Sequence, residues 1–287
     1  MARIAWYGAG MMGSGFVEAL CLRGDEVAVW NRTPEKARAL ERFGAKAYDD
    51  PRNAARGAER VHIILSDDGA VDGLLERLAG AIEPGSLVID HTTVAPRPTA
   101  ARFERSDRLG LEFLHAPVFM GPQSCREGTG MMMCSGPVAR FERAEDELKK
   151  MTGKLWYVGE RTDKAATLKL VGNQMLFFIV AGLADSYALA RSMDIMPAEA
   201  YELFGHFKPG GAVDARGKSM SEGNFKAAFE LTMARKDARL MLETAAAGNV
   251  PLHVLPAIAQ RFDELIAAGH GAQDMGVLAV DSMTARK

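Results

Sequence analysis

Two polar residues that could move a proton stand four positions apart in the segment Lys169-Leu170-Val171-Gly172-Asn173. On a helix, positions i and i+4 share one face. A lysine amine that is partly removed from water has a lowered pKa and can exchange a proton near neutral pH, while an amide one turn away can orient a substrate hydroxyl. A solvated helix face is the commoner role of such a pair, but these residues directly precede the most apolar run of the chain. The segment therefore predicts a proton donor, Lys169, and an orienting amide, Asn173.

A second candidate group, Lys236-Asp237, follows Phe229 in the C-terminal part of the chain. Adjacent lysine and aspartate side chains often form an exposed ion pair that has no other role. The residue types alone do not decide between a site and such a pair. The six histidines are scattered, and neither a paired-histidine nor a Cys-x-x-Cys spacing occurs, so no metal site is expected.

The N-terminal stretch has the pattern of a dinucleotide-binding turn. An apolar strand over 3–7 leads into a G-x-G-x-x-G sequence, and a second strand over 26–30 completes a βαβ unit. Gly8 permits the tight turn, Gly10 lets the backbone approach a pyrophosphate, and Gly13 lets the helix pack on the strand. The pattern recurs by chance, but this context favours a dinucleotide site over a turn without a ligand. The predicted contacts in the turn are Gly8, Ala9, Gly10, Met11 and Met12.

The residues that close the second strand favour NADP(H) over NAD(H). Enzymes that use NAD usually carry Asp or Glu about 20 residues past the glycines, where the carboxylate binds the ribose hydroxyls and repels a 2′-phosphate. This chain has Asn31-Arg32-Thr33 instead. Asn31 is neutral, Arg32 can stack on adenine and pair with a phosphate, and Thr33 can add a hydroxyl donor. If Arg32 is only a solvated surface charge, NAD(H) is possible but disfavoured.

Length and charge narrow the class of partner. A chain of 287 residues is long enough for two domains. With 35 basic and 37 acidic residues it has no net field that would attract nucleic acid or an anionic membrane, so a small molecule is expected as the partner. Three cysteines and an N-terminus that begins directly with a strand favour a reducing, cytoplasmic setting over export.

The order of elements predicts an α/β domain over 1–162 and an all-helical domain over 163–287. Short apolar strands alternate with helical stretches in the first part, which is typical of a doubly wound Rossmann-type sheet. One of these strands ends in Leu65-Ser66, at the edge where such sheets bind ligands. We expect the active site in a cleft between the two domains. The helices expected in the second part cover 164–193, 197–204, 225–247 and 251–268.

The most apolar run of the chain covers residues 175–184. Ten residues are too few to span a bilayer. A helix that is apolar on all sides is normally buried in a core or a subunit interface. The run is therefore predicted to be the spine of the second domain.

Together these motifs resemble those of the β-hydroxyacid dehydrogenase family, which includes 3-hydroxyisobutyrate dehydrogenases and glyoxylate or succinic semialdehyde reductases. The resemblance covers nearly the whole chain and includes the loop Asp90-His91-Thr92-Thr93. It implies an oxidoreductase that moves a hydride between NADP(H) and a small β-hydroxy acid or semialdehyde. Lys169 would be the general acid/base and Asn173 would orient the substrate.

The same resemblance assigns further residues. Thr92 and Thr93 would contact substrate and nicotinamide, and Lys236, beside Asp237, would lie near both. Asp274 resembles a C-terminal position of the family. The helical domain would form a homodimer or homotetramer, which suits the apolar run over 175–184.

In one loop the chain departs from the family pattern. Family members usually carry Pro-Val-Ser-Gly-Gly to bind the substrate carboxylate, whereas this chain reads Pro117-Val118-Phe119-Met120-Gly121. Either both large side chains turn into the core and backbone amides alone hold the carboxylate, or at least one lines the cleft and favours a substrate with an apolar body. We expect the second arrangement, with Phe119, Met120 and Gly121 as substrate-binding residues.

Two other functions stay open. An imine reductase would reduce a C=N bond on the same fold, but related imine reductases generally lack a lysine at the catalytic position. A non-catalytic dinucleotide-binding module could use the fold for protein interaction. Such a module has no reason to keep Lys169, Asn173 and Lys236 together, so both alternatives are ranked below the reductase.

Overall fold

The first strand, β1 (Arg3–Tyr7), shows how the N-terminal part of the chain is layered. Side chains alternate between the two faces of a strand. Ile4 and Trp6 belong to one hydrophobic core, Ala5 and Tyr7 belong to another, and all four are completely buried. β1 therefore lies inside a sheet that is covered on both faces, as a doubly wound fold requires.

The structure is a computed structural model that describes residues 2–283. The chain divides into two units, Met1–Asn173 and Gln174–Lys287. The junction falls inside the helix α8 (Lys164–Arg191), so the first turns of this helix belong to the first unit. The domain boundary expected between 162 and 163 stays a prediction.

The sheet of the first unit has the strand order β3-β2-β1-β4-β5-β6-β8-β7, and β9 pairs with β8. Neighbours from β3 to β6 along this order are parallel, whereas β8 runs antiparallel to β6 and β7. The doubly wound sheet predicted from the sequence is thus confirmed. The remaining strands are β2 (Glu26–Trp30), β3 (Lys46–Ala47), β4 (Arg60–Ile63), β5 (Leu87–Asp90), β6 (Glu112–His115), β7 (Val118–Phe119), β8 (Met131–Ser135) and β9 (Lys154–Gly159).

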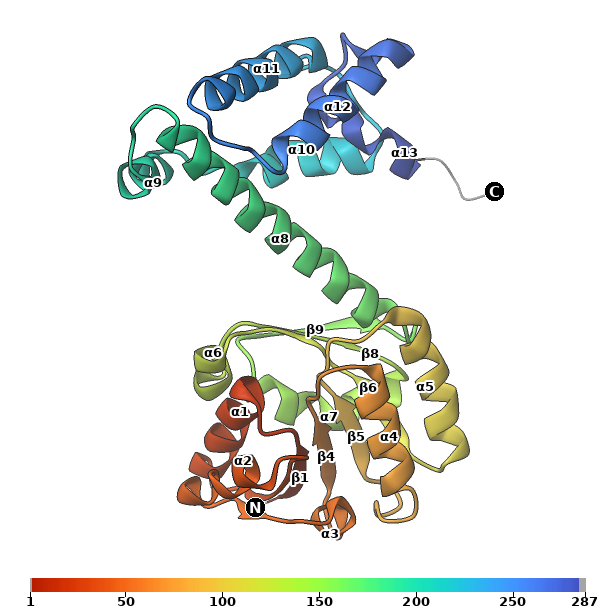
Figure 1. The fold of residues 1–287 in the computed structure, drawn as a ribbon. Helices are drawn as coiled ribbons and strands as arrows, with labels where there is room; N and C mark the ends of the chain where they lie inside the picture. Colours follow the sequence, from red (N-terminus) through yellow and green to blue (C-terminus); the bar gives the residue numbers. More distant parts are fainter. Residues whose placement is uncertain (1, 284–287) are drawn as a thin grey trace. The chain divides into compact units, whose positions relative to one another are not determined.

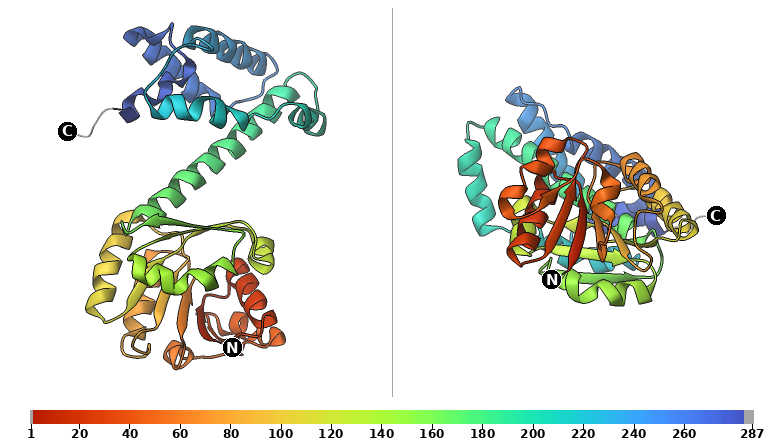
Figure 2. Two further views of the ribbon diagram at one scale, coloured as in Figure 1. Left: turned by 180° about the vertical axis from the view of Figure 1, so that it is seen from behind. Right: turned by 90° about the horizontal axis from the view of Figure 1, so that it is seen from below.

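Helices cover both faces of this sheet. The face of Ile4 and Trp6 is covered by α1 and α7, and the opposite face by α3, α4 and α5. α7 lies behind the sheet in Figure 1 and in front of it in the reverse view of Figure 2. The helices of this unit before α8 are α1 (Met11–Leu22), α2 (Pro34–Arg38), η1 (Glu41–Phe43), α3 (Pro51–Ala55), α4 (Asp68–Leu78), α5 (Pro96–Arg108), α6 (Pro122–Glu127) and α7 (Val138–Lys149).

Three elements of the first unit, β7, α3 and α6, are too short to be expected from the alternation of strands and helices in the sequence. None is longer than six residues, which is too short for a hydrophobic period to show. Their signals are local instead. Asp50 accepts a hydrogen bond from the amide of Arg52 and caps α3, and a proline stands in the first turn of both α3 and α6.

The second unit is built from helices, as predicted, around a core formed mainly by α11 (Leu231–Ala247) and α12 (Leu255–Leu265). Figure 1 shows these helices in blue. The carboxylate of Asp185 accepts hydrogen bonds from three consecutive amides, His253, Val254 and Leu255, at 2.8–3.0 Å, and so holds the start of α12. The other helices are α9 (Pro197–His206), α10 (Gly211–Ser221), the π-helical turn η2 (Ile266–His270), the 3₁₀ turn η3 (Met275–Ala279) and α13 (Val280–Met283).

Details of the second unit differ from the prediction. Residues 225–230 and 251–254 precede their helices and are not part of them. α10 lies outside the four helices expected from the sequence and begins at two consecutive glycines, Gly210 and Gly211. Glycine is tolerated at a helix start, and these two residues are the N-cap and first residue of α10.

The apolar run of α8 is exposed in the single chain. Phe177 is 69% and Val180 is 67% exposed, and no hydrophobic cluster of the described residues includes 175–184. The predicted burial of the run in the core of the single chain is therefore wrong, and its burial in a subunit interface stays a prediction. The run belongs to a 28-residue helix with a mean hydropathy of 1.5 in its most apolar window. By length and composition alone, this helix could cross a membrane, so the ten residues of the run do not exclude a span. A core helix of a soluble protein passes the same test, so this pattern does not identify a membrane span.

Candidate active site

The glycine turn after β1 has the shape that the sequence predicts. Gly8 has a φ of +108°, and a Cβ at this position would lie 2.0 Å from the carbonyl oxygen of Ile64. A Cβ on Gly13 would lie 2.0 Å from the carbonyl oxygen of Gly8, so α1 packs directly on the turn. No atom lies within 4 Å of the corresponding point on Gly10, which leaves its backbone open to a ligand. The start of α1 has no side-chain cap, so its first amides are available to a phosphate.

A cavity of about 660 Å³ opens beside this turn. It brings together nine of the predicted cofactor residues: Gly8, Gly10, Met11, Met12, Asn31, Arg32, Thr33, Leu65 and Ser66. The size of the cavity, its open glycine backbone and its helix N-terminus fit the pyrophosphate and adenosine parts of a dinucleotide.

Asn31 ties the end of β2 to the glycine turn. Its Oδ1 accepts a hydrogen bond of 2.9 Å from the backbone amide of Ala9, and its Nδ2 donates to the carbonyl oxygen of Thr33 at 2.9 Å. The side chain therefore fixes the turn and the following loop at the same time. The sequence pattern indicated a neutral residue here but not this connection.

Three cations line the cavity: Arg32 after β2, Lys36 on α2 and Arg77 on α4. The Arg77 guanidinium lies 5.4 Å from the centre of the Trp30 ring. Sequence reasoning missed Lys36 and Arg77. Arg77 could have been found from its spacing, because it stands four and eight residues after two glycines that line the same cavity, and such positions share a helix face. The lining residues that the sequence did not indicate are Trp30, Lys36, Ile64, Gly69, Ala70, Gly73, Leu74 and Arg77.

Thr92 and Thr93 differ sharply in exposure. Thr92 is 1% exposed, its Oγ1 accepts a hydrogen bond of 3.0 Å from the amide of Leu65, and its own amide donates to Oδ1 of Asp90 at 2.9 Å. Thr92 thus connects the loops that follow β4 and β5. Thr93 is exposed. Contacts of either threonine with substrate or nicotinamide stay predictions.

Two histidines support these loops from inside the sheet. His91 and His62 are almost fully buried, and the rings of Trp6 and Phe16 stack against the pair. His91 Nδ1 lies 2.8 Å from the carbonyl oxygen of Ala116 and so donates to it, which makes His91 Nε2 the acceptor of the 2.9 Å bond from His62 Nδ1. Burial lowers the pKa of His91 to about 4 and lowers that of His62 well below its usual value. Both rings are therefore neutral at pH 7.

Lys169 and Asn173 form the predicted pair at the start of α8. Lys169 Nζ donates to Asn173 Oδ1 at 2.9 Å, and Lys169 is only 8% exposed. Burial lowers the pKa of this amine to about 8. The two residues thus have the spacing and the environment of a proton-exchanging pair.

The loop that departs from the family pattern divides its large side chains. Phe119 lies in β7, and its ring centre is 3.9 Å from Lys169 Nζ. Met120 packs against the core on the α1 and α7 side of the sheet. Gly121 is exposed and precedes α6. The loop therefore places one apolar ring beside the lysine and turns the other side chain toward the core.

Lys236 and Asp237 lie on α11 in the second unit and form an ion pair of 2.7 Å with each other. A place for Lys236 near substrate or nicotinamide stays a prediction. Asp274 has a structural role: one oxygen accepts from the amides of Ala228 and Phe229, and the other accepts from Gly276 and Arg216. It fixes the segment that leads into α11.

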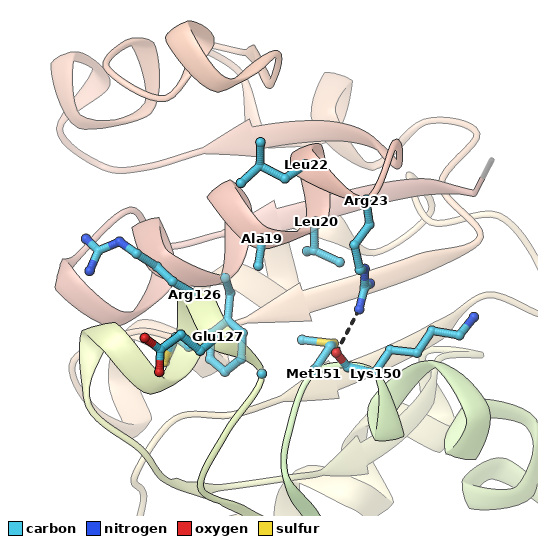
Figure 3. Close-up of a pocket in the computed structure, with 11 residues that line it drawn as sticks. Ala19, Leu20, Leu22, Arg23, Arg126, Glu127, Lys150 and Met151 are labelled. Atoms are coloured by element: carbon cyan, nitrogen blue, oxygen red, sulfur yellow. Dashed lines mark hydrogen bonds between the residues drawn. The ribbon is translucent and has the colours of Figure 1, made fainter.

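A smaller cavity of about 290 Å³ lies at the other end of α1 and is drawn in Figure 3. There the Arg23 side chain donates to the carbonyl oxygen of Lys150 at 3.0 Å. Two charged groups on its rim are paired, Lys150 with Glu147 and Arg126 with Glu18. None of the predicted site residues lines this cavity, so the turn after β1 remains the candidate site.

Two family models match the chain. The NAD binding domain of 6-phosphogluconate dehydrogenase matches residues 3–159, and the NAD-binding domain of NADP-dependent 3-hydroxyisobutyrate dehydrogenase matches residues 164–280. The first match alone spans more than half of the chain, and the two meet where the sheet gives way to helices.

Relatives and solved structures agree with these models. The chain is 26% identical to 2-(hydroxymethyl)glutarate dehydrogenase from Eubacterium barkeri, over 96% of this chain and 93% of that protein. It is 28% identical to 3-hydroxyisobutyrate dehydrogenase from Pseudomonas aeruginosa, over 89% of this chain and 90% of that protein. An imine reductase from Myxococcus stipitatus, solved in complex with NADP⁺, shares the fold with a TM-score of 0.91 at 22% identity, over 97% of this chain and 99% of that one. The resemblance noted in the sequence is thereby confirmed, and the chain belongs to the β-hydroxyacid dehydrogenase family of NAD(P)-dependent oxidoreductases.

Proposed function

We propose that this protein is an NADP(H)-dependent reductase, or the reverse dehydrogenase, of a small semialdehyde or β-hydroxy acid. The observation that carries the proposal is the pair of Lys169 and Asn173, in which a buried amine with a pKa of about 8 donates to an amide 2.9 Å away. A group whose pKa lies near the working pH is suited both to give and to take a proton.

The bound dinucleotide would supply or accept the hydride. In reduction, the Lys169 ammonium donates a proton to the carbonyl oxygen as the carbonyl carbon gains the hydride. In oxidation, the neutral amine takes the proton of the hydroxyl group. Asn173 accepts one hydrogen of Lys169 with Oδ1, so its Nδ2 can donate to the substrate oxygen and orient it.

The charge around the cavity supports NADP(H) as the preferred cofactor. Arg32, Lys36 and Arg77 line it, and the residue that closes β2 is the neutral Asn31. Three cations near the adenosine end favour a 2′-phosphate, and a carboxylate that would repel this group is absent from position 31.

The loop around Phe119 supports a substrate with an apolar body. The serine hydroxyl that usually meets the substrate carboxylate is replaced by a ring that lies against Lys169. An apolar surface beside the proton donor favours an aldehyde with an alkyl or aryl part over a small hydrophilic one. Met120 packs on the core and supports this preference only indirectly.

Reduction of a C=N bond is the second candidate function. An imine reductase shares the fold of this chain, and at 22% identity this likeness shows the fold alone, so this reaction ranks second. Lys169 supports the carbonyl reaction instead. Hydride transfer to a carbonyl creates an alkoxide that needs a proton, whereas hydride transfer to an imine that is already protonated gives a neutral amine directly.

We further infer a homodimer or homotetramer in the cytoplasm. Six consecutive residues of α8, from Met175 to Val180, are each 47–69% exposed, and a contiguous apolar surface of this kind is typical of a subunit interface. The three cysteines Cys21, Cys125 and Cys134 are unpaired, which suits a reducing compartment. Light scattering on the purified chain, with Phe177→Glu as the variant, tests the assembly, and flotation with lipid vesicles tests the competing role of α8 in a membrane.

NADPH consumption against a panel of semialdehydes, apolar aldehydes and cyclic imines tests the function. We expect turnover of aldehydes that is lost in Lys169→Ala, with NADPH binding retained. Turnover of imines alone would support the second candidate. Binding of NADPH without turnover of any of these compounds would support a non-catalytic module.

A further inference from the structure

The ammonium of Lys169 faces the ring of Phe119. The distance from Nζ to the ring centre is 3.9 Å, well inside the range of about 6 Å over which a cation is attracted to an aromatic face. Burial is the cause of the lowered pKa of Lys169. The ring of Phe119 and the Oδ1 atom of Asn173 both contact the amine.

A glycine on α8 makes this contact possible. Gly172 follows Lys169 by three positions and lies on the same helix face. A Cβ on Gly172 would be 2.2 Å from Cζ of Phe119, so any side chain here would displace the ring. Glycine costs helix stability relative to alanine, and in this chain it leaves the space that the Phe119 ring occupies.

The neighbouring strand β8 and the residue before it, Gly130, fix the backbone of Phe119. Phe119 pairs with Met131 in the β7–β8 ladder. Gly130 has a φ of +83°, and a Cβ there would lie 2.8 Å from the carbonyl oxygen of Phe119. The ring is therefore held between a strand and a helix before any ligand binds.

We infer that Phe119 is a positioning residue for Lys169, whose ammonium its ring face holds beside Asn173, and that Gly172 lets the ring come close enough to do so. The catalytic consequence rests on the proposed function. The contact itself belongs to the chain without substrate and can be measured there.

The pKa of Lys169 should fall when the ring of Phe119 loses its electron-rich face. The ring stabilises the charged form of the amine and so raises its pKa, whereas burial lowers this pKa. Loss of the attraction is expected to lower this pKa by about 0.4–1.5, which corresponds to the usual strength of a cation–ring contact.

Carbon-13 NMR of the lysine Cε atoms in the full chain tests this, with Lys169→Met to assign the signal. Phenylalanine with one, two or three ring fluorines is placed at position 119, because fluorine weakens the negative ring face with little change in size. We expect the pKa of Lys169 to fall stepwise with the number of fluorines. The same analogues at Phe141, a ring that stacks on Tyr157, serve as the control and should leave this pKa unchanged. A pKa that does not respond to fluorination at position 119 overturns the inference.

Substitutions by natural amino acids give a second test of the effect of the ring on the pKa of Lys169. Phe119→Tyr keeps the aromatic face and should preserve the pKa of Lys169, whereas Phe119→Leu and Gly172→Ala should lower it. A merely structural role would instead reduce thermal stability and leave the pKa in place, which contradicts the inference. If the NMR series responds as expected and no aldehyde is turned over, the proposed function fails and the positioning role stands. If aldehydes are reduced and the pKa of Lys169 does not respond to the ring, the positioning role fails and the proposed function stands.

Discussion

Oδ1 of Asn31 accepts a hydrogen bond of 2.9 Å from the backbone amide of Ala9, which links the end of β2 to the turn that would hold the pyrophosphate. The two residues are 22 positions apart in the chain. Through this bond, the loop that we propose selects the cofactor also shapes the loop that we propose binds its phosphates. Cofactor affinity and cofactor choice should therefore respond to one side chain.

Asn31→Ala is expected to weaken NADPH and NADH alike. Loss of one neutral hydrogen bond corresponds to about a 2- to 12-fold increase in Kd. Asn31→Asp is the matched variant, because its carboxylate can still accept from Ala9 but places a negative charge near the ribose. Isothermal titration should show that Asn31→Asp loses NADPH affinity selectively. An equal loss of both cofactors in Asn31→Asp would contradict this account of the loop.

Arg32→Ala is expected to lower the affinity for NADPH by roughly ten- to a hundred-fold and to leave NADH nearly unaffected, because a charge-assisted hydrogen bond to the 2′-phosphate is lost. Arg77→Ala should act in the same direction with a smaller effect, since this side chain lies against Trp30. Arg38→Ala is the control, because Arg38 pairs with Asp49 and does not line the cavity. Equal affinities of the parent for the two cofactors would refute the preference.

The parts of the site that could be predicted from the sequence are those set by local chemistry. Gly8 and Gly13 are required by the backbone of one turn, and Lys169 and Asn173 share a face at a fixed helical spacing. The alternation of strands and helices likewise follows from short-range patterns. Apart from the approach of Gly8 to the distant carbonyl of Ile64, these features need no knowledge of distant contacts.

The parts that could not be predicted depend on which distant surfaces meet. Arg77 lines the cavity because the fold brings its guanidinium, on α4, near the ring of Trp30 at the end of β2. The hydroxyl of the buried Thr92 accepts from the amide of Leu65 in another loop. The exposure of Phe177 depends on what covers α8, which a hydrophobicity pattern does not reveal. The residue types show whether these side chains are polar or apolar, but they do not show which residues each side chain contacts.

Lys169→Ala is expected to lower turnover by about 10²–10⁴-fold and to leave cofactor binding almost intact, because a positioned acid contributes about this much to the rate. Asn173→Ala should cost less, since it orients the substrate and does not move the proton. Single-turnover rates at saturating NADPH make the comparison. Parent-like turnover in Lys169→Ala would move the proton donor elsewhere, with Lys236 as the next candidate.

The pH dependence of the two reaction directions should differ in sign. Because the pKa of Lys169 is lowered to about 8, the ammonium predominates below pH 8 and the neutral amine above it. Reduction, which needs the ammonium, should slow as pH rises through about 8, and oxidation should speed up over the same interval. Profiles of kcat/KM in both directions check this expectation. Parallel profiles would mean that another group titrates.

Acid should destabilise the first unit through its buried histidine pair. The pKa of His91 is lowered to about 4 and that of His62 is also lowered, so the unfolded chain binds these protons at a higher pH than the folded one does. This contribution to stability is present above about pH 6.5 and is lost as pH falls toward 4. The thermal midpoint should therefore drop between pH 7 and pH 5. His91→Gln should flatten the drop and His206→Gln, at an exposed position, should not.

The loop at Phe119 and Met120 should set the substrate preference, and the double variant Phe119→Ser/Met120→Gly restores the pattern usual in the family. In the parent, the Phe119 ring occupies the space beside Lys169 where a serine hydroxyl would otherwise be available to a carboxylate. The parent should therefore prefer bulkier apolar aldehydes over tartronate semialdehyde and glyoxylate. The double variant should shift this ranking toward the small polar substrates by about 10- to 200-fold in relative kcat/KM, because a change of one methylene-sized group is worth about 1–3 kcal/mol.

The single variants separate the two side chains. Since Met120 packs on the core and Phe119 lies against the lysine, Phe119→Ser alone should produce most of the shift in preference, and Met120→Gly should mainly reduce stability. The measurement is kcat/KM for glyoxylate, tartronate semialdehyde, succinic semialdehyde and larger apolar aldehydes, with the thermal midpoint recorded for each variant. If the parent already prefers the smallest polar substrate, and the double variant keeps the same ranking, these side chains do not shape the substrate pocket.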